Sequence, residues 1–259
     1  MNNNISTRQS SNFIIATFGN RILLAPLLVF IIGAPTILMT KLVFYLLNSD
    51  FLVKRVPTIS KAAAYAPGYY IFFAGMVIVC VCIITTVIFV YKLYLYRIDR
   101  LSLPHAAERN LKITIIIGCT FCVLAGLSLG LLSIISLEVN DPIHVGLSIC
   151  FFAFQSFAYI FDTICAVRIK KLALVQHIEI DNLSLNGKPE LCIILSVLAV
   201  FYLFMFLSKD SSLYSDDLFA HQLYTITEYI WANLAFLYSA LYYPEIKNHF
   251  FNHLTKNCR

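Results

Sequence analysis

The polar residues best suited to chemistry fall on one line of an otherwise apolar segment, residues 144–168. At about 100° per residue, His144, Ser148, Gln155, Tyr159 and Asp162 lie within roughly 60° of one another on a helix. The other faces carry Phe, Ile, Leu, Val, Ala and Cys, so we expect this helix in a bilayer. An ionisable side chain there is costly unless it faces protein or a wet cavity, which makes His144 and Asp162 candidate functional residues. The same line also fits a purely structural seam of interhelical hydrogen bonds, and the sequence leaves both interpretations open.

A second acidic residue, Glu228, lies near the start of the last apolar segment. Small or weakly polar residues follow it on the same helical face, namely Ala232, Ala235 and Ser239. This pattern predicts a face that packs against protein and carries the carboxylate. A rim position that looks at water fits the sequence as well.

The elements that must position these residues are membrane helices. The 259 residues are 59% hydrophobic and only 13% charged, which is far more apolar than a soluble domain. A spanning helix needs about 20 apolar residues. The sequence therefore predicts an all-α, polytopic bundle in a single membrane domain, residues 1–259, with six transmembrane helices at about 22–47, 69–95, 113–136, 144–167, 191–208 and 223–243.

The basic residues predict the orientation of this bundle. Fourteen of the 19 Lys and Arg residues fall in the N-terminus, the second and fourth connections and the tail. Four lie on the other side (Lys54, Arg55, Lys61 and Lys209), and Lys41 lies inside the first span. Basic residues are retained in the cytosol, so both termini are predicted to be cytosolic. The sequons at Asn4 and Asn182 should then carry no glycan.

The sequence contains no motif that supports binding of a metal, a nucleotide or a nucleic acid. Seven of the eight cysteines lie within predicted spans, and the Cys119–Cys122 pair lacks the second pair of a zinc site. No phosphate-binding loop and no nucleophile elbow is present. We expect no metal, no cofactor and no nucleic-acid partner.

Three short motifs in order resemble a known family. They are Pro57-x-Ile59-Ser60 with Tyr65, Pro67 and Ile71-Phe72; Ile143-His144; and Glu228-Tyr229 with Phe236. Together they resemble the six-span family that contains the DRAM autophagy modulators, the related phosphoinositide-kinase regulators and the post-GPI-attachment lipid-remodelling factors. The second and third motifs are closer to the GPI-remodelling branch, whereas the spacing of the first is closer to the DRAM branch.

The resemblance implies a multi-pass endomembrane protein of the Golgi or endoplasmic reticulum that acts on lipid of the luminal leaflet, such as a GPI lipid. His144 would be a general base, Glu228 would orient it, and the loop residues Pro57, Ile59, Ser60 and Pro67 would hold the head group. The charge distribution puts all of these at the non-cytosolic end. We therefore expect Ser60, His144 and Glu228 to converge there, while the sequence leaves open whether the chain is an enzyme.

Two other functions fit the sequence. The first is a non-catalytic, DRAM-like adaptor or regulator of lipid or phosphoinositide homeostasis, whose basic cytosolic loops (Arg97, Arg100, Lys170 and Lys171) bind a protein partner. The second is transport along the seam from His144 to Asp162. Transport is less favoured because the spans show no inverted repeat and no paired broken helices.

Overall fold

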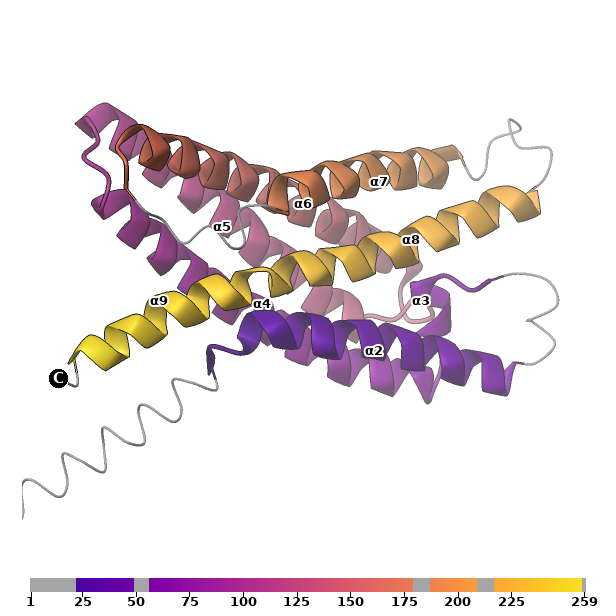
Figure 1. The fold of residues 1–259 in the computed structure, drawn as a ribbon. Coiled ribbons are helices and arrows are strands. Elements are labelled where there is room, and N and C mark those ends of the chain that lie inside the picture. Colours follow the sequence, from indigo (N-terminus) through magenta and orange to yellow (C-terminus); the bar gives the residue numbers. More distant parts are fainter. Residues whose placement is uncertain (1–21, 49–55, 179–186, 209–216, 258–259) are drawn as a thin grey trace, which may run out of the picture.

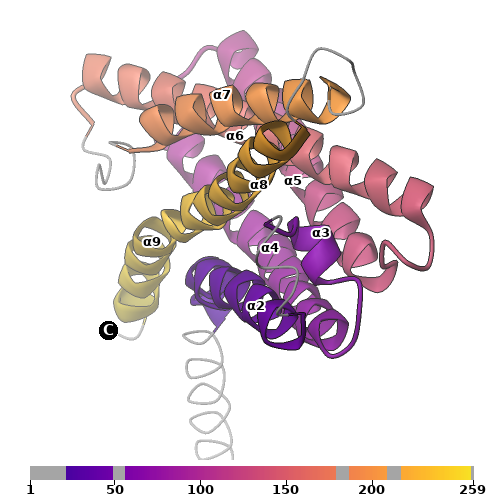
Figure 2. The ribbon, with the colours of Figure 1, turned by 90° about the vertical axis from the view of Figure 1, so that its right-hand side faces the viewer.

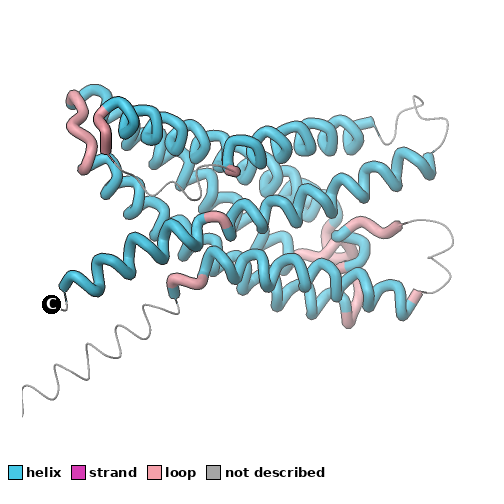
Figure 3. Tube along the Cα trace, viewed as in Figure 1, coloured by secondary structure: helices cyan, strands magenta, loops and turns pink. Residues whose placement is uncertain are grey.

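The computed structural model describes residues 22–48, 56–178, 187–208 and 217–257, and the regular structure within these ranges is helical (Figure 3). The six longest described helices correspond to the six predicted apolar segments. Their bounds are α2 (Ala25–Leu47), α4 (Gly68–Asp99), α5 (His105–Ile134), α6 (Asp141–Val175), α7 (Lys188–Ser208) and α8 (Asp217–Ala240). A short α3 (Ile59–Ala62) precedes α4, and α9 (Tyr242–Asn257), which the sequence did not predict as a helix, follows α8. The sequons at Asn4 and Asn182 lie outside the described residues.

Five of these helices, α2 and α4 to α7, are long and apolar enough to cross a membrane, which makes the chain an integral multi-pass protein. The helix α8 has 24 residues but is not among the five. It is long enough to span but more polar than the others, since its sequence includes His221, Glu228 and Asn233. Membrane crossing by α8, and with it the sixth span and the side on which the termini lie, remains a prediction.

The six long helices form a closed ring. Each packs against the next along the chain, and α8 also packs against α2, so that α8 closes the ring between α7 and α2 (Figure 2). Trp231 of α8 is fully buried and donates its indole N–H to the backbone oxygen of Leu195 on α7, at 3.1 Å. The polar character of α8 follows from this position, because its polar groups have protein on several sides.

Gly118, Gly126 and Gly130 form a groove of small residues on α5 that faces two neighbouring helices. A Cβ atom on Gly118 would come within 3.1 Å of Phe161 on α6. One on Gly126 would instead meet Ile83, and one on Gly130 would meet Cys80, both on α4. The groove therefore lets α5 approach both of its ring neighbours closely.

The bundle has two ends that differ in content. The short helix α3 and the starts of α4, α6 and α8 lie at one end, which is to the right in Figure 1, and we call it the α3 end. The ends of α4 and α6, the start of α2 and the helix α9 lie at the other, the α9 end. With 32 and 35 residues, α4 and α6 are longer than the roughly 20 residues that a bilayer core requires.

Candidate functional site

The short helix α3 presents Ser60 at one end of the bundle. Thr58 caps α3, since its side chain accepts the backbone N–H of Lys61 at 3.1 Å, and such a cap satisfies a donor that the first turn leaves free. Gly68 lets α3 turn back onto α4, because a Cβ atom there would lie 2.7 Å from the backbone oxygen of Ala62. The Thr58 cap thus fixes the start of α3, and the close packing at Gly68 fixes its end against α4.

The Ser60 hydroxyl and the His144 imidazole are in hydrogen-bond contact. Ser60 Oγ lies 2.8 Å from His144 Nε2, and His144 Nδ1 lies 2.6 Å from the backbone oxygen of Ile135. A carbonyl oxygen only accepts hydrogen bonds, so Nδ1 carries the proton of the neutral imidazole. Nε2 is then the acceptor, and the Ser60 hydroxyl donates to it. His144 is only 3% exposed, so protein surrounds this pair.

The start of α6 fixes the position of His144. The Asn140 side chain caps α6 by accepting the N–H of Ile143 at 3.1 Å, and the Asn140 backbone oxygen accepts the N–H of His144 at 3.0 Å. Pro142 lies in the first turn, where a missing N–H breaks no helical bond. Ile135 caps the end of α5, where carbonyl groups lack helical partners and are free to accept from the imidazole.

Glu228 hydrogen-bonds to the backbone beside Ser60. Its Oε2 atom accepts the backbone N–H of Ile59 at 3.0 Å, and the residue is 5% exposed. The expected role, orienting His144, differs from what the structure shows. Both ring nitrogens of His144 are bonded to other groups, so a backbone carbonyl orients the imidazole while Glu228 fixes the residue next to Ser60.

A cavity of about 470 Å³ lies beside this pair. Ser60 and His144 belong to its wall, together with Tyr202 of α7 and with His221 and Tyr224 of α8. The Tyr202 and Tyr224 rings stack with centroids 4.9 Å apart, and their hydroxyl oxygens are 3.0 Å apart. A ligand in the cavity would therefore meet the serine, the imidazole and two phenols.

A much smaller cavity, of about 30 Å³, lies next to Glu228 and is also lined by Ser60 and Ser148. Roughly 10–15 Å³ of such space is enough for one water molecule. The carboxylate thus has room for water beside it, which would lower the cost of keeping it charged inside the bundle.

The four predicted head-group residues occupy different surroundings. Pro57 and Ile59 are buried, and Pro67 is exposed where it precedes α4. Ser60 lines both cavities, and Ile59 lines the small one. Of the four, Ser60 is therefore the residue in a position to meet a ligand in the large cavity.

Sequence reasoning missed His221, Tyr202 and Tyr224. His221 Nε2 contacts the backbone oxygen of Val56 at 3.0 Å and so ties α8 to the segment before α3. A signal for two of the three was present, since His221 and Tyr224 precede Glu228 by seven and four residues and hence share its helical face. Tyr202 carried no such signal, because its helix is apolar on every side.

The middle of the predicted seam makes interhelical hydrogen bonds. The Tyr159 hydroxyl donates to the backbone oxygen of Ala235 on α8 at 2.6 Å, and the Gln155 amide nitrogen lies 4.0 Å from Cys122 Sγ on α5. Both residues are buried. Gln155 and Tyr159 thus fix α6 to its neighbours, which is the structural interpretation of the seam.

A surface contact joins the connections around the site. The Tyr65 hydroxyl, after α3, donates to Glu138 Oε1 in the connection between α5 and α6. This hydrogen bond to the carboxylate, followed by desolvation, raises the pKa of the Tyr65 phenol above its ordinary value. The contact links the segment that carries Ser60 to the one that leads into His144.

Comparison with known protein families assigns the chain to one of them. Residues 21–249 match the Frag1/DRAM/Sfk1/Cwh43P N-terminal domain. The chain belongs to this family. Searches among curated proteins and among solved structures found no match. The resemblance inferred from the three motifs is therefore confirmed at the level of the Frag1/DRAM/Sfk1/Cwh43 family.

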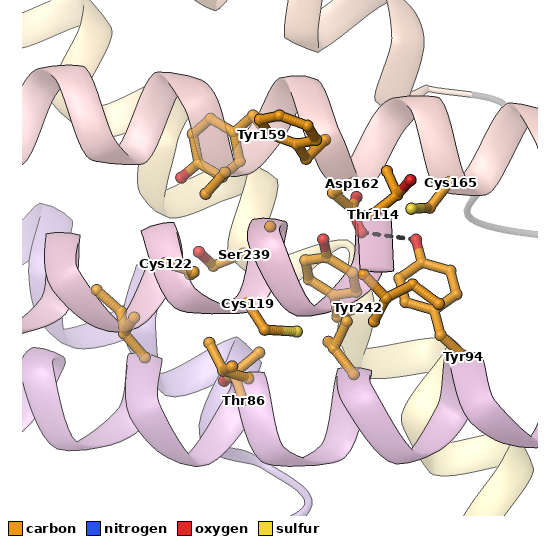
Figure 4. Close-up of a pocket in the computed structure, with 17 residues that line it drawn as sticks. Thr86, Tyr94, Thr114, Cys119, Cys122, Tyr159, Asp162, Cys165, Ser239 and Tyr242 are labelled. Carbon is orange, nitrogen blue, oxygen red and sulfur yellow. Dashed lines mark hydrogen bonds between the residues drawn. The ribbon is translucent and has the colours of Figure 1, made fainter. Parts of the chain in front are cut away.

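At the α9 end, this family member places the partly buried Asp162 among hydroxyl donors. Tyr94 of α4 donates to Asp162 Oδ1 at 2.6 Å, and Tyr238 of α8 donates to Oδ2 at 2.7 Å (Figure 4 shows the bond from Tyr94). The carboxylate thus faces the interior of the ring, and it reaches two other helices. Lys188 Nζ, at the start of α7, lies 3.8 Å from Oδ2.

Two further charges complete a buried ionic cluster of Arg97, Asp162, Lys188 and Glu245. Glu245 of α9 forms ion pairs with Lys188 Nζ at 2.8 Å and with Arg97 at 2.7 Å, and the Lys188 ammonium lies 3.6 Å from the centroid of the Tyr242 ring. The side chain of Lys188 is 0% exposed. Two cations and two anions balance one another, as buried charges require.

This cluster corrects the sequence-based interpretation of Arg97 and Lys188. Both were counted among the basic residues of cytosolic loops, and Arg97 was assigned to a surface for a protein partner. Both are buried. The charge count used only the positions of these residues in the sequence, whereas in the structure Glu245 of α9 pairs with both side chains.

A cavity of about 40 Å³ lies beside Asp162 (Figure 4). Its wall includes Asp162, Tyr94 and the thiols of Cys119, Cys122 and Cys165. This volume suits a few water molecules but not a lipid. Among the described residues, no three His, Cys, Asp or Glu side chains are grouped so that they could hold a metal ion.

Proposed function

We propose that this family member acts on lipid of the non-cytosolic leaflet and remodels the lipid part of GPI anchors in the Golgi or endoplasmic reticulum. The observation that carries the proposal is the cavity of about 470 Å³ beside the Ser60–His144 pair. Such a cavity offers space for part of a lipid next to groups that can transfer a proton. A second cavity, beside Asp162 toward the opposite end of the bundle, measures about 40 Å³.

Three considerations support this choice of lipid. The charge distribution predicts that the α3 end is non-cytosolic, where the acyl chains and the glycan of a GPI lipid meet the membrane surface. The cavity wall combines the polar residues His144 and His221 with apolar ones such as Val145 and Phe206, which suits a molecule with a polar head and acyl chains. The chain also belongs to the Frag1/DRAM/Sfk1/Cwh43P family, and its second and third motifs resemble those of the post-GPI-attachment lipid-remodelling factors.

The test is lipid analysis of GPI anchors by mass spectrometry. Cells lacking the chain should show altered anchor fatty acids, and the wild-type chain should restore them. His144→Ala and Glu228→Ala should each fail to restore them, and the double variant should be little worse than either single one, because the residues act as one unit. His105→Ala serves as a matched control, since His105 is exposed at the start of α5. Normal anchor lipids in cells lacking the chain would refute the proposal.

A further inference from the structure

We propose that Ser60 is a nucleophile that carries an acyl group as a covalent ester, with His144 as its general base. The inference rests on the proposed function for the identity of its lipid substrate, but its chemistry follows from the geometry around Ser60. It assigns to Ser60 a role beyond holding a head group.

The Ser60–His144 pair has the arrangement that activates a serine. A nucleophile needs a base within hydrogen-bond reach and a third group that orients the base. Ser60 Oγ is 2.8 Å from His144 Nε2, and the Ile135 carbonyl is 2.6 Å from Nδ1. The carbonyl keeps the proton on Nδ1, so the lone pair of Nε2 faces the serine hydroxyl. A backbone oxygen thus fixes the tautomer and the orientation of the imidazole, which is one of the two roles of the carboxylate in Ser-His-Asp enzymes.

The position of the serine is fixed through its backbone. Glu228 holds the N–H of Ile59, and Thr58 caps the same turn. Ile59 and Ala62 are the buried residues of α3 and pack it against the bundle. Glu228 is therefore a positioning residue, which acts on Ser60 through the peptide next to it.

The large cavity offers a hydrogen-bond donor for the oxygen of a reacting ester. The hydroxyl groups of Tyr202 and Tyr224 are 3.0 Å apart and line the same cavity as Ser60. Two hydroxyl groups have two protons, and their mutual hydrogen bond uses one of them. The second proton remains to be donated to an oxygen in the cavity, where developing negative charge would be stabilised.

The reaction is a transfer in two steps. Ser60 Oγ forms a bond to the carbonyl carbon of a lipid ester while its proton passes to His144 Nε2. The bond from that carbon to the alcohol oxygen then breaks, and the alcohol leaves with the proton from Nε2. In the second step water or a lipid hydroxyl attacks the carbonyl carbon of the acyl-serine and gives its proton to His144 Nε2. The bond from that carbon to Ser60 Oγ then breaks, Oγ takes the proton back from Nε2, and the acyl group leaves as a free acid or as an ester of the attacking lipid.

A long-chain alkyl fluorophosphonate tests the nucleophile directly on the purified full chain. Attack by Ser60 would form a bond from Oγ to phosphorus and expel fluoride, and peptide mass spectrometry would locate the adduct. We expect an adduct on Ser60 of the wild type and none at this position in Ser60→Ala. His144→Ala should lower the rate of labelling by about 100-fold or more, the usual contribution of a general base.

Matched variants separate chemistry from folding. Ser133→Ala removes a buried hydroxyl that donates to its own helix, at the Gly130 oxygen, and labelling of Ser60 should be unchanged. Glu228→Gln retains an oxygen that can accept the N–H of Ile59, so it should keep most of the labelling that Glu228→Ala loses. An equal loss in Glu228→Gln and Glu228→Ala would overturn the positioning role.

Two outcomes distinguish this inference from the proposed function. If the wild type, monodisperse in detergent, forms no adduct on Ser60, or if Ser60→Ala restores normal GPI anchors in cells lacking the chain, the acyl-serine is refuted while the lipid role stands. If Ser60 is labelled in a His144-dependent way but anchors are normal without the chain, the nucleophile is supported and the GPI substrate is refuted.

Discussion

The two ends of the bundle use the same helix in opposite ways. At the α3 end, α6 brings His144 beside a cavity of about 470 Å³, where its partners are a hydroxyl and a carbonyl group. At the α9 end, α6 brings Asp162 among two phenols and an ammonium group, and about 40 Å³ of space remains. The cavity and the uncharged partners of His144 suit the binding and reaction of a ligand. The closely packed and balanced charges around Asp162 suit a structural role, in which they hold helices together. The role of an ionisable residue in a membrane helix therefore depends on the groups and the space around its side chain.

The largest effect that this comparison predicts is on reactivity at the α3 end. His144→Ala should reduce fluorophosphonate labelling of Ser60 by about 100-fold or more, with a smaller loss of stability than a change in the ionic cluster causes. Labelling kinetics and thermal unfolding in detergent, measured on the same preparations, check both parts. A variant that unfolds more readily than Glu245→Ala would contradict the division between the two ends.

The largest expected loss of stability is at the α9 end. Glu245→Ala removes the shared partner of Arg97 and Lys188 and leaves two buried cations with one anion. Breaking a buried ion pair by removing one member typically lowers the free energy of unfolding by about 3–5 kcal/mol. Unfolding in detergent micelles measures this loss of free energy. The matched control is Glu190→Ala, because Glu190 is an exposed glutamate near the start of α7. Equal stability of the two variants would mean that the cluster is not structural.

A smaller effect is expected from a single hydroxyl group. Tyr94→Phe removes one of the two phenol donors to Asp162 and should lower the free energy of unfolding by about 1.5–3 kcal/mol, the range for hydrogen bonds to charged groups. Tyr91→Phe, on the same helix, provides the comparison. Labelling of Ser60 should be unaffected by Tyr94→Phe, and a parallel loss would show that the two ends are coupled.

The smallest effect concerns the exposed contact of Tyr65 with Glu138. The raised pKa of the phenol means that the folded chain favours its neutral form. The stabilisation is therefore fully present below the unfolded pKa of about 10 and is lost as the pH rises through the higher folded value. In NMR titrations of ring-labelled tyrosine, the Tyr65 signal should titrate at lower pH in Glu138→Gln than in the wild type. An unchanged midpoint would show that the contact does not form in solution.

Much of the fold could be predicted from the sequence because hydropathy and helix length are local properties. The predicted segments 144–167 and 191–208 lie within α6 and α7, and 22–47 covers α2 with three residues before its start. The helices α4 and α6 extend beyond the predicted apolar segments. The helix α9 was missed, since its polar sequence shows no span. Whether α8 crosses the membrane stays a prediction, because its polar residues face neighbours that the sequence does not identify.

The candidate site could be predicted only where motif positions marked it. Ser60, His144 and Glu228 were selected together, and in the structure Ser60 hydrogen-bonds His144 while Glu228 hydrogen-bonds the neighbouring residue Ile59. The contact partners could not be predicted, because Ile135 contributes a backbone oxygen, and every residue has one. The burial of Arg97 and Lys188 was not predicted for a related reason, since burial of a charge depends on a distant counter-charge.

The hydrogen bond from Ile59 to Glu228 joins residues 169 positions apart, and that from Ser60 to His144 spans 84. A ribosome synthesises the N-terminal parts of a chain first, so the serine and the histidine are made well before the carboxylate that steadies them. Glu245, which neutralises Arg97 and Lys188, is made later still. Both ends of the bundle are thus completed only when the C-terminal helices arrive, and a chain arrested earlier in translation would contain the serine and the histidine without a finished site.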